Sequence, residues 1–327
     1  MDTRSIGPAV AMLGLPIESP MIKTNASWDG ASPVLSILSP FFHDDPRPLL
    51  SALDVQARSV GGRVELLVVD DGSRDETLAV AVAAHLDGLA TPACFVRFLG
   101  NQGRAAARNT LGSRARGQFL LFLDSDVLPG SQTFLETYFA AMDAAEVAVI
   151  VGGFTMGHSP EPDRALHQYM SQTFNCLSAA DRQATAWKYT YSANLMVPAE
   201  VFAVAPFDPG YAGWGWEDLE WGLRIADHWP IFHIDNTVIH EGLDPDHLLL
   251  GKIAQSCVNF ARVASAHPTG IRTYECYRVA RQIRGLPARE AMANMAKWLA
   301  LAQAAPLPVR GLAVRVYRAL IYSLALY

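Results

Sequence analysis

Long apolar runs, paired cysteines and an excess of positive charge are all missing from this 327-residue chain. No uninterrupted apolar segment approaches the roughly 18 to 20 residues that cross a bilayer, and the first residues lack a basic region followed by an apolar signal segment. The four cysteines lie far apart without a CxxC pair, which argues against a disulfide framework and a zinc knuckle. We therefore expect a cytoplasmic protein with reduced thiols in its core.

Positive charge is scarce along most of the chain and concentrated in its last quarter. Residues 1–250 hold 15 Lys and Arg against 30 Asp and Glu, whereas residues 251–327 hold 11 against 2, a net charge of +9. Within this tail, Arg315 and Arg318 share one face of an expected amphipathic helix. Such a helix suits peripheral association with the inner face of a membrane, and the alternative is a helix packed on the body with its arginines in water. We expect no nucleic-acid partner.

The pattern of apolar residues changes at about residue 33. Residues 1–32 mix Gly, Pro, Ser and Asn without periodicity and predict a loosely ordered arm. Beyond them, short β-branched runs alternate with helical patterns. We expect strands at 33–39, 64–71, 94–99 and 118–124, and helices at 46–59, 74–86 and 103–115, with Ser73 or Asp75 capping the second helix. This alternation predicts an α/β fold with a mostly parallel sheet and a ligand site at the carboxyl ends of its strands.

Carboxylates gather where these strands end. Asp70 and Asp71 close one strand, and Asp124 and Asp126 close a later one. Four carboxylates at one edge would repel each other unless a cation or the donors of a ligand lay among them. Oxygen ligands of this kind suit Mg²⁺ or Mn²⁺, although an isolated Asp-x-Asp pair can simply cap the next turn.

A second unusual segment, YAGWGWEDLEWGLR, covers residues 211–224 and contains three tryptophans and three carboxylates. Large aromatic side chains usually enter a core and carboxylates usually face water. A segment that contains both is either a surface turn that leaves aromatic side chains unfavourably exposed or a binding site. From Glu217 onward its pattern is helical, so an acidic cap at the start of a helix is one explanation of Glu217.

Three further segments, VVDDGSRDET, NQGRAAARN and FLDSDV, follow expected strands in this order. With them, the chain resembles an inverting family 2 glycosyltransferase of the GT-A fold, which transfers a sugar from a nucleotide diphosphate donor, from about residue 33 to 241. The resemblance implies a GT-A domain at 33–245, with a nucleotide-binding half at 33–130 and an acceptor-binding half at 131–245, followed by a basic helical extension at 246–327. The QxxRW element of many members is absent, and RQIRGL at 281–286 only partly matches it, which favours single addition over processive synthesis.

The same resemblance implies roles for residues on the donor side. The nucleotide-binding residues are expected to be Ser39, Pro40, Asp70, Asn101, Gly103, Arg108, Asn109 and Asp124. Asp126 is expected to hold Mn²⁺ or Mg²⁺ between the two phosphates, where the ion offsets the charge of the departing diphosphate. His240 ends a later β-like run and is expected to be a further metal ligand; the alternative is a histidine hydrogen-bonded to backbone at a strand end.

On the acceptor side, GWGxED resembles an element of galactosyltransferase-like members in which the aspartate is the general base. This implies Asp218 as the base and Glu217 as a ligand of sugar hydroxyls, with Trp214 stacking on the sugar. Gly213 and Gly215 would let the loop approach it closely. The chemistry is reasonable because a carboxylate beside tryptophans is partly desolvated and hence more basic. Trp216 and Trp221 fit a core equally well.

Two other functions share parts of this pattern. A haloacid-dehalogenase-type phosphatase would use Asp124 as its nucleophile, but its motif should close the first strand of the domain, and here at least three expected strands precede it. A non-catalytic scaffold that binds sugar nucleotides could use the same fold. Because Asp126, Asp218 and His240 occur together, we expect instead a hexosyl- or N-acetylhexosaminyltransferase that moves one sugar from a UDP-sugar to a glycan or lipid-linked acceptor.

Overall fold

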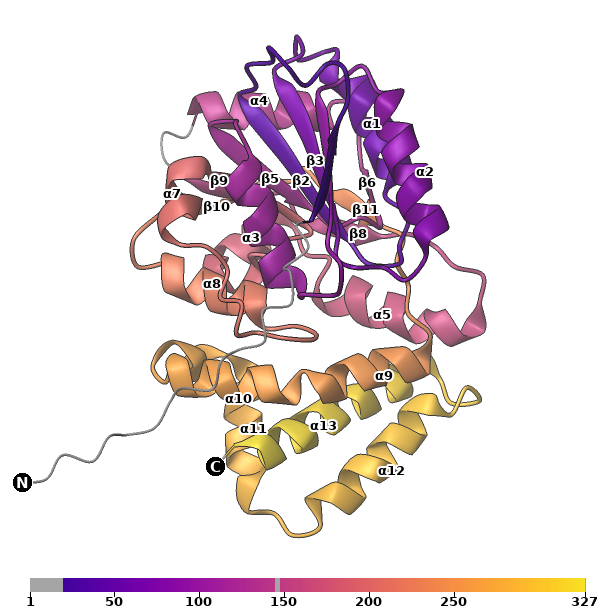
Figure 1. Ribbon diagram of the computed structural model, residues 1–327. Helices are drawn as coiled ribbons and strands as arrows, with labels where there is room; N and C mark the ends of the chain where they lie inside the picture. The colour runs from indigo at the N-terminus through magenta and orange to yellow at the C-terminus, as the bar shows by residue number, and fades with distance from the viewer. Residues whose placement is uncertain (1–19, 145–147, 327) are drawn as a thin grey trace, which may run out of the picture.

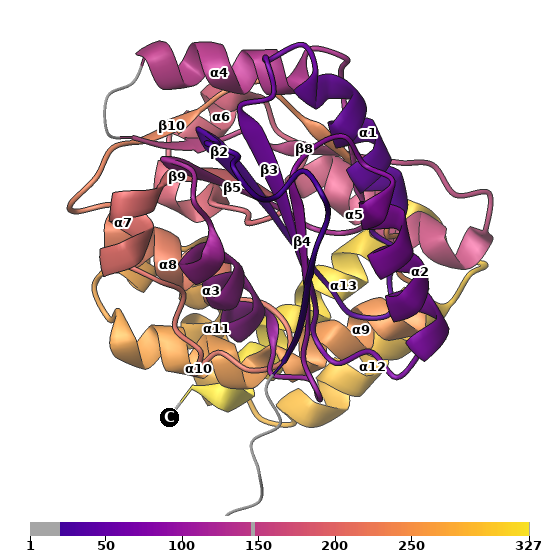
Figure 2. The ribbon, with the colours of Figure 1, turned by 45° about the horizontal axis from the view of Figure 1, so that its top comes forward.

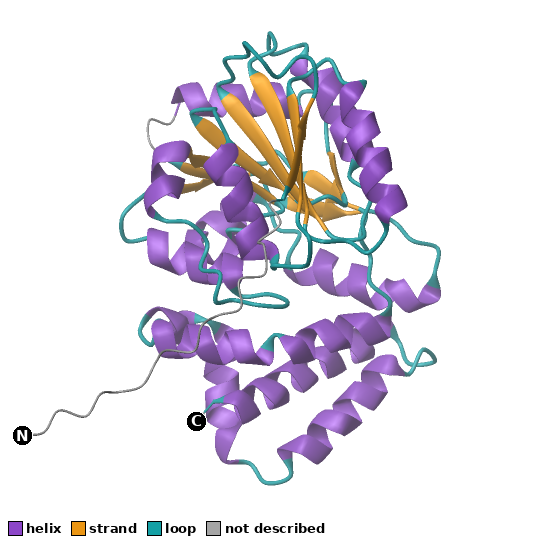
Figure 3. Cartoon of the chain, viewed as in Figure 1, coloured by secondary structure: helices purple, strands orange, loops and turns teal. Residues whose placement is uncertain are grey.

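The structure is a computed structural model that describes residues 20–144 and 148–326. Figure 1 shows two layers, an α/β part built around a central sheet and, below it, a layer formed by helices α9 to α13. Figure 3 shows the strands confined to the upper part. Helix α9 begins at Asp246, directly after the boundary expected at residue 245.

The main sheet has eight strands, and its two halves differ in direction. Their order is β1 (Met21–Thr24), β4 (Ala93–Arg97), β3 (Val64–Asp70), β2 (Leu35–Phe41), β5 (Phe119–Leu123), β9 (Asn194–Pro198), β7 (Val149–Val151) and β10 (Ile231–His233). Strands β4, β3, β2 and β5 are parallel, whereas β9 runs antiparallel to both β5 and β7. The mostly parallel sheet expected from the sequence is thus a mixed sheet in its second half.

Both faces of the parallel strands are buried, which explains why they are continuous apolar runs. Side chains of β3 alternate between two cores. Leu66 and Val68 lie in the core that includes α1 (Arg47–Ala57) and α2 (Glu76–Asp87), and Leu67 and Val69 lie in the core that includes α3 (Arg104–Arg114) and α7 (Ala199–Val204). Figure 2 shows α1 and α2 on one side of the sheet and α3, α7 and α8 on the other. The strand ends are therefore held by packing on two sides.

The helices of the α/β part are α1 (Arg47–Ala57), α2 (Glu76–Asp87), α3 (Arg104–Arg114), α4 (Phe134–Ala144), α5 (Ala165–Phe174), α6 (Ala179–Gln183), α7 (Ala199–Val204) and α8 (Glu217–Ile225). Short 3₁₀ turns lie at η1 (Pro162–Arg164) and η2 (Ala186–Tyr189). The four strands and three helices expected before residue 125 are confirmed as β2 to β5 and α1 to α3. Asp75 caps α2, since its carboxylate accepts from the backbone N–H groups of Thr77 and Leu78.

Residues 21–24 depart from the loosely ordered arm expected at 1–32. They form the edge strand β1, which pairs antiparallel with β4. The Asn25 amide fixes the end of β1, donating to the carbonyls of Leu86, Leu89 and Thr91 and accepting from the N–H of Ala93. Pairing satisfies the backbone groups of β4, which would otherwise be an open edge. Residues 1–19 of the expected arm lie outside the described residues.

The C-terminal layer contains α9 (Asp246–Gln255), α10 (Cys257–Ala266), α11 (Glu275–Gln282), α12 (Arg289–Leu301) and α13 (Leu307–Ala325), with 3₁₀ turns η3 (Gly270–Thr273) and η4 (Ile283–Gly285). Helix α13 packs on α12, and its Val314, Tyr317 and Leu320 are buried in a core shared with α9. A buried ion pair joins Arg310 to Asp246. The terminal helix therefore packs on the body, as in the alternative, but only one of its two arginines is in water, since Arg315 is exposed and Arg318 is partly buried.

Two expectations drawn from absences can be compared with the structure. All four cysteines are free, with Cys94 buried and the other three partly buried. Among the residues the structure describes, none of the helices combines the length and apolar character required to cross a membrane.

Candidate functional site

Two strands bring Asp126 and His240 together although 114 positions separate them in sequence. Asp124 and Asp126 follow the end of β5, and the chain continues into β6 (Val127–Pro129) of a small second sheet with β11 (Val238–His240) and β8 (Phe154–Met156). Strands β6 and β11 are antiparallel, with Val127 opposite His240. The His240 Nε2 atom consequently lies 3.7 Å from Asp126 Oδ1.

Asp124, Asp126 and His240 form a group whose ligand atoms all lie within 4.8 Å of one another. Two carboxylates and one imidazole suit Mn²⁺ or Mg²⁺. Gly242 makes room for them, because a Cβ atom there would lie 1.8 Å from Asp126 Oδ2. The buried Nδ1 atom of His240 has no hydrogen-bond partner among the described residues, so a bond from that atom to backbone does not hold the ring. The residues present fit a divalent metal.

The two aspartates of this group differ in proton affinity. Burial raises the pKa of Asp126, and the neighbouring charge of Asp124 adds to this effect. Burial also raises the pKa of Asp124, but Arg108, Arg104 and His240 outweigh it and leave that pKa below its ordinary value. A cation bound between them would stabilise the ionised form of both.

The guanidinium of Arg108 connects this group to the tryptophan-rich segment. Arg108 is only 2% exposed, on α3, and lies 3.0 Å from Asp124 Oδ1, 3.3 Å from Glu217 Oε1 and 3.6 Å from Asp218 Oδ1. Burial lowers its pKa, but the three carboxylates together outweigh this and raise it. Its expected place beside the nucleotide stays a prediction, since in this structure its charge is directed to acidic side chains.

Helix α8 places Glu217 and Asp218 at its first positions. Trp216 precedes it in the left-handed region, with φ of 78°, which turns the chain sharply into the helix. Glu217 is buried and also lies 3.9 Å from Arg104, so it is both an acidic residue at a helix start and a partner of two arginines.

Asp218 is more open than Glu217 and has unused hydrogen-bonding capacity. Its Oδ2 atom accepts from the backbone N–H of Ser192, 3.1 Å away. Its buried Oδ1 atom has no hydrogen-bond partner among the described residues. Burial and then the charge of Glu217 raise the pKa of Asp218 to about 7, against the opposing charge of Arg108. A carboxylate with this pKa can accept a proton near neutral pH.

All four expected carboxylates follow the ends of parallel strands at one edge of the sheet, but only Asp124 and Asp126 belong to the metal-binding group. Asp70 is fully buried, accepts from the N–H of Ser73 at 2.7 Å and lies 3.2 Å from the Nε atom of Arg97. Asp71 accepts from the Asn101 side chain and from the N–H groups of Gln102 and Gly103. Loop groups satisfy Asp71, whereas Asp70 pairs with Arg97 of β4 and its buried Oδ2 atom accepts no hydrogen bond among the described residues. Neither carboxylate is part of the metal-binding group found among those residues.

The other expected donor-side residues shape the same loops. Asn109 forms two hydrogen bonds with the backbone of Phe207, 2.8 and 3.0 Å long, which fasten α3 to the segment before α8. Gly103 precedes α3 with φ of 91°. Ser39 is buried in β2 with no partner for its Oγ among the described residues, and Pro40 is half-buried. Their contacts with a nucleotide stay predictions.

The loop that carries Trp214 is held by the C-terminal layer. Gly213 and Gly215 have φ of 80° and 79°, a conformation that favours glycine, and Trp214 is half-buried between them. The Asn259 amide of α10 donates to the carbonyls of Ala212 and Gly215, each 2.9 Å away. That the C-terminal layer holds this loop could not be predicted from the sequence, because a single asparagine on a helix has no diagnostic pattern.

The remaining tryptophans of the segment belong to the core. Trp216 packs on Phe260 and Tyr322, with ring centroids 5.1 and 5.6 Å apart, and donates from Nε1 to the Tyr322 hydroxyl. Trp221 is fully buried and donates to the Ala205 carbonyl. The alternative that both are structural is confirmed.

Comparisons with known proteins identify related sequences. The sequence model of the family described as "Glycosyl transferase family 2" matches residues 36–197. A validoxylamine A glucosyltransferase of Streptomyces hygroscopicus subsp. limoneus is 28% identical over 72% of this chain and 57% of its own length. An N-acetylglucosaminyltransferase of Rhizobium leguminosarum bv. trifolii is 30% identical over 38% of this chain and 70% of its own length. The chain spans about half the length of the validoxylamine A glucosyltransferases it matches.

A solved structure extends the comparison to the fold. The mannosyltransferase PcManGT from Pyrobaculum calidifontis, solved in complex with GDP-Man and Mn²⁺, matches with a TM-score of 0.57 at 15% identity. The match covers 91% of this chain and 90% of that one. At this identity the likeness concerns the fold alone, and with the family match it confirms the expected GT-A fold.

Proposed function

Because the chain belongs to glycosyl transferase family 2, we propose that it is an inverting transferase that moves one hexosyl or N-acetylhexosaminyl group from a UDP-sugar to a hydroxyl of a glycan or lipid-linked acceptor. One observation carries this proposal: the contacts of Arg108 bring Asp124 of the metal-binding group and Asp218 of GWGxED to the same guanidinium. A donor site and a base are needed within reach of one reacting carbon, and these contacts support that arrangement.

Asp218 is proposed as the general base. Its carboxylate takes the proton of the acceptor hydroxyl, the acceptor oxygen forms a bond to the anomeric carbon, and the bond from that carbon to the diphosphate breaks. Attack from the face opposite the leaving group inverts the configuration. The backbone N–H of Ser192 orients the carboxylate through Oδ2, and Arg108 lies on the side of Oδ1. We retain the likeness of this element to the galactosyltransferase-like GWGxED as part of the proposal.

Asp124, Asp126 and His240 are proposed to hold Mn²⁺ or Mg²⁺, which when bound would offset the negative charge of the departing diphosphate. Trp214 is proposed to stack on the sugar, in a loop whose glycines permit close approach. Arg108 pairs with Asp124, Glu217 and Asp218, and its positive charge offsets the repulsion among these three carboxylates in one site.

Turnover with a panel of nucleotide sugars tests the proposed function. The protein is incubated with Mn²⁺ and UDP- or GDP-linked hexoses and N-acetylhexosamines, with glycan or polyprenyl-linked acceptors, and nucleotide release is measured. We expect release from a UDP-sugar that increases with acceptor. Release only from a GDP-sugar would correct the donor base, and no release from any donor would favour the non-catalytic scaffold.

We further propose that the C-terminal layer associates with anionic membranes where a lipid-linked acceptor would lie. Helix α12 exposes Met295 and Trp298, which are 69% and 71% exposed, and α13 exposes Leu312. These apolar side chains lie in the segment of net charge +9, and apolar insertion combined with basic charge is how peripheral helices bind anionic bilayers.

Co-sedimentation with vesicles of phosphatidylglycerol and phosphatidylcholine tests this association. We expect the M295S/W298S variant to lose several-fold in vesicle binding, because it removes two apolar side chains from the bilayer contact. The matched control is V80S/V204S, which changes two side chains that are 67% and 71% exposed on α2 and α7. Equal binding by wild type and M295S/W298S would refute the association.

A further inference from the structure

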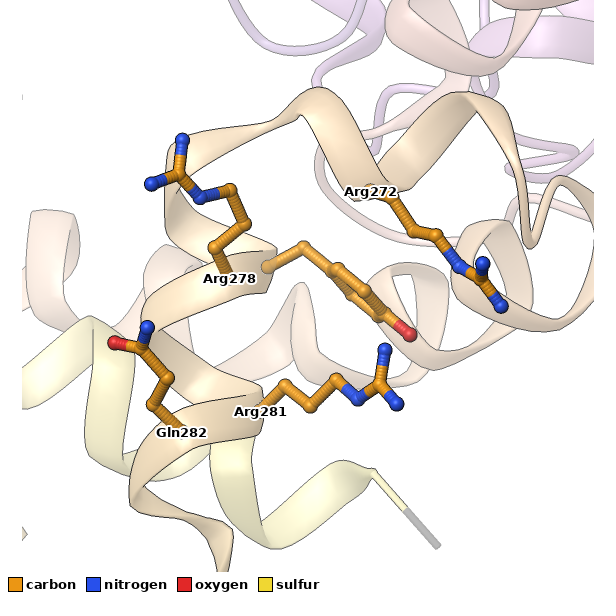
Figure 4. A pocket seen from close by; sticks show the side chains of 5 residues that line it. Arg272, Arg278, Arg281 and Gln282 are labelled. Atoms are coloured by element: carbon orange, nitrogen blue, oxygen red, sulfur yellow. The ribbon is translucent and has the colours of Figure 1, made fainter.

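The C-terminal layer contains a pocket that the proposed function does not use. It has a volume of about 410 Å³, and it is lined by Arg272, Tyr277, Arg278, Arg281 and Gln282. This volume falls in the range of roughly 300 to 1,000 Å³ that is usual for ligand pockets. Figure 4 shows Arg272 and Arg281 extending their guanidinium groups toward the same side, while Arg278 extends away from them.

The charges of this pocket are uncompensated within the described residues. Its lining contains three arginines and no acidic side chain. Glu275, the acidic residue of α11, has its carboxylate 3.7 Å from Arg315 instead. Arginines without carboxylate partners, grouped around one pocket, offer a charge-assisted site for an anion with several oxygens, and the planar guanidinium matches the geometry of phosphate.

The pocket is joined to the acceptor side of the candidate site through aromatic packing. Tyr277 in its lining packs on Phe260, with ring centroids 6.2 Å apart, and Phe260 packs on Trp216 at 5.1 Å. Trp216 directly precedes Glu217 and Asp218 at the start of α8. Two ring contacts therefore separate the arginine pocket from the helix that presents the proposed base.

We propose that this pocket binds a phosphate or diphosphate group, with Arg272 and Arg281 as its main ligands. Such a group can come from the head of a lipid or from a soluble phosphorylated sugar, and both present the same oxygens to the guanidinium groups. This step rests on the proposed function: the acceptor carries a phosphate group, and the pocket holds that charged end of the acceptor on the side of Trp216.

Binding of inorganic pyrophosphate tests the site by calorimetry, without metal or nucleotide sugar, so that the outcome does not depend on transfer. We expect R272Q/R281Q to weaken pyrophosphate binding by about tenfold or more, since charge-assisted bonds from two arginines are lost. The matched control is R58Q/R74Q, which removes the same charge from exposed positions of the α/β part. Equal weakening in both variants, unchanged binding in R272Q/R281Q, or no binding by wild type would each overturn the proposal.

A second arm distinguishes the two sources of the phosphate. Farnesyl diphosphate and glucose 1-phosphate are titrated into wild type and R272Q/R281Q. Tighter binding of farnesyl diphosphate than of pyrophosphate, lost in the variant, assigns the site to a lipid head. Binding of glucose 1-phosphate at least as tight as that of farnesyl diphosphate, also lost in the variant, assigns it to a soluble phosphorylated sugar. If the variant binds both probes as wild type does, the pocket is not a phosphate site, whether or not the protein transfers sugar.

Discussion

Replacing Asp218 with asparagine should lower kcat for sugar transfer by roughly 10²- to 10⁴-fold, the usual contribution of a general base. Asparagine keeps the size of the side chain and an oxygen that can accept from Ser192, but it cannot take the proton of the acceptor hydroxyl. The nucleotide donor should bind the variant nearly as it binds wild type. Single-turnover transfer and calorimetric titration of UDP measure the two properties separately. The matched control is D227N, which changes an exposed aspartate just beyond α8.

The pH dependence of the wild-type enzyme follows from the same carboxyl group. Burial and the charge of Glu217 raise the pKa of Asp218 to about 7. A base acts only when deprotonated, so kcat/KM should rise with pH through about 7 and fall tenfold for each pH unit below it. The residual activity of D218N should lack this rise. A variant that loses transfer and UDP binding to the same extent, or that retains the wild-type profile, would contradict the assignment of Asp218.

Replacing Asp126 with alanine should remove the dependence of donor binding on Mn²⁺. The affinity of the variant for the UDP-sugar in Mn²⁺ should fall to that of wild type in a chelator, and transfer should fall by about 10²-fold or more, since a metal supplies several kcal/mol of charge stabilisation. Titration of Mn²⁺ against donor affinity and turnover measures both effects. Donor binding by the variant that still increases with Mn²⁺ would exclude Asp126 as a ligand.

Thermal unfolding separates this loss from a loss of structure. Burial raises the pKa of Asp126 above its unfolded value, so the ionised carboxylate is less favourable in the folded state than in the unfolded chain. The contribution of Asp126 to stability is therefore present at low pH and is lost as pH rises through its folded pKa. At neutral pH and without metal, D126A should unfold at a temperature equal to or above that of wild type. A lower Tm would indicate structural damage instead.

The sequence predicted the first half of the fold well because its signals there are local. Strand β3 is a continuous apolar run and α2 carries its own cap at Asp75, so each element is specified by adjacent residues. The second half was harder to predict. Strands β6, β8 and β11 have three residues each, too few to show a period, yet the pairing of β6 with β11 is what brings His240 to Asp126.

Contacts between distant segments were the part of the candidate site that could not be predicted. The motif NQGRAAARN points to Arg108 as a residue of interest, but nothing local shows that its guanidinium reaches Asp124, Glu217 and Asp218. Asp70 and Asp71 carried the same strand-end signal as Asp124 and Asp126, but Asp70 pairs with Arg97 and Asp71 accepts from the N–H groups of a distant loop. Gly242 was missed although it lies two residues after His240, because the reason for a glycine there appears only when Asp126 lies beside it.

The loop at 211–216 has consequences for engineering this protein. Asn259 donates to its carbonyl groups, and Trp216 packs on Phe260 and Tyr322, so residues beyond 245 hold this loop in place. A chimaera that exchanges residues 246–327 for those of a relative would therefore change the residues on which the helix that carries Asp218 packs. Altering acceptor preference by domain exchange requires that the loop at 211–216 and the helices that contact it be exchanged together.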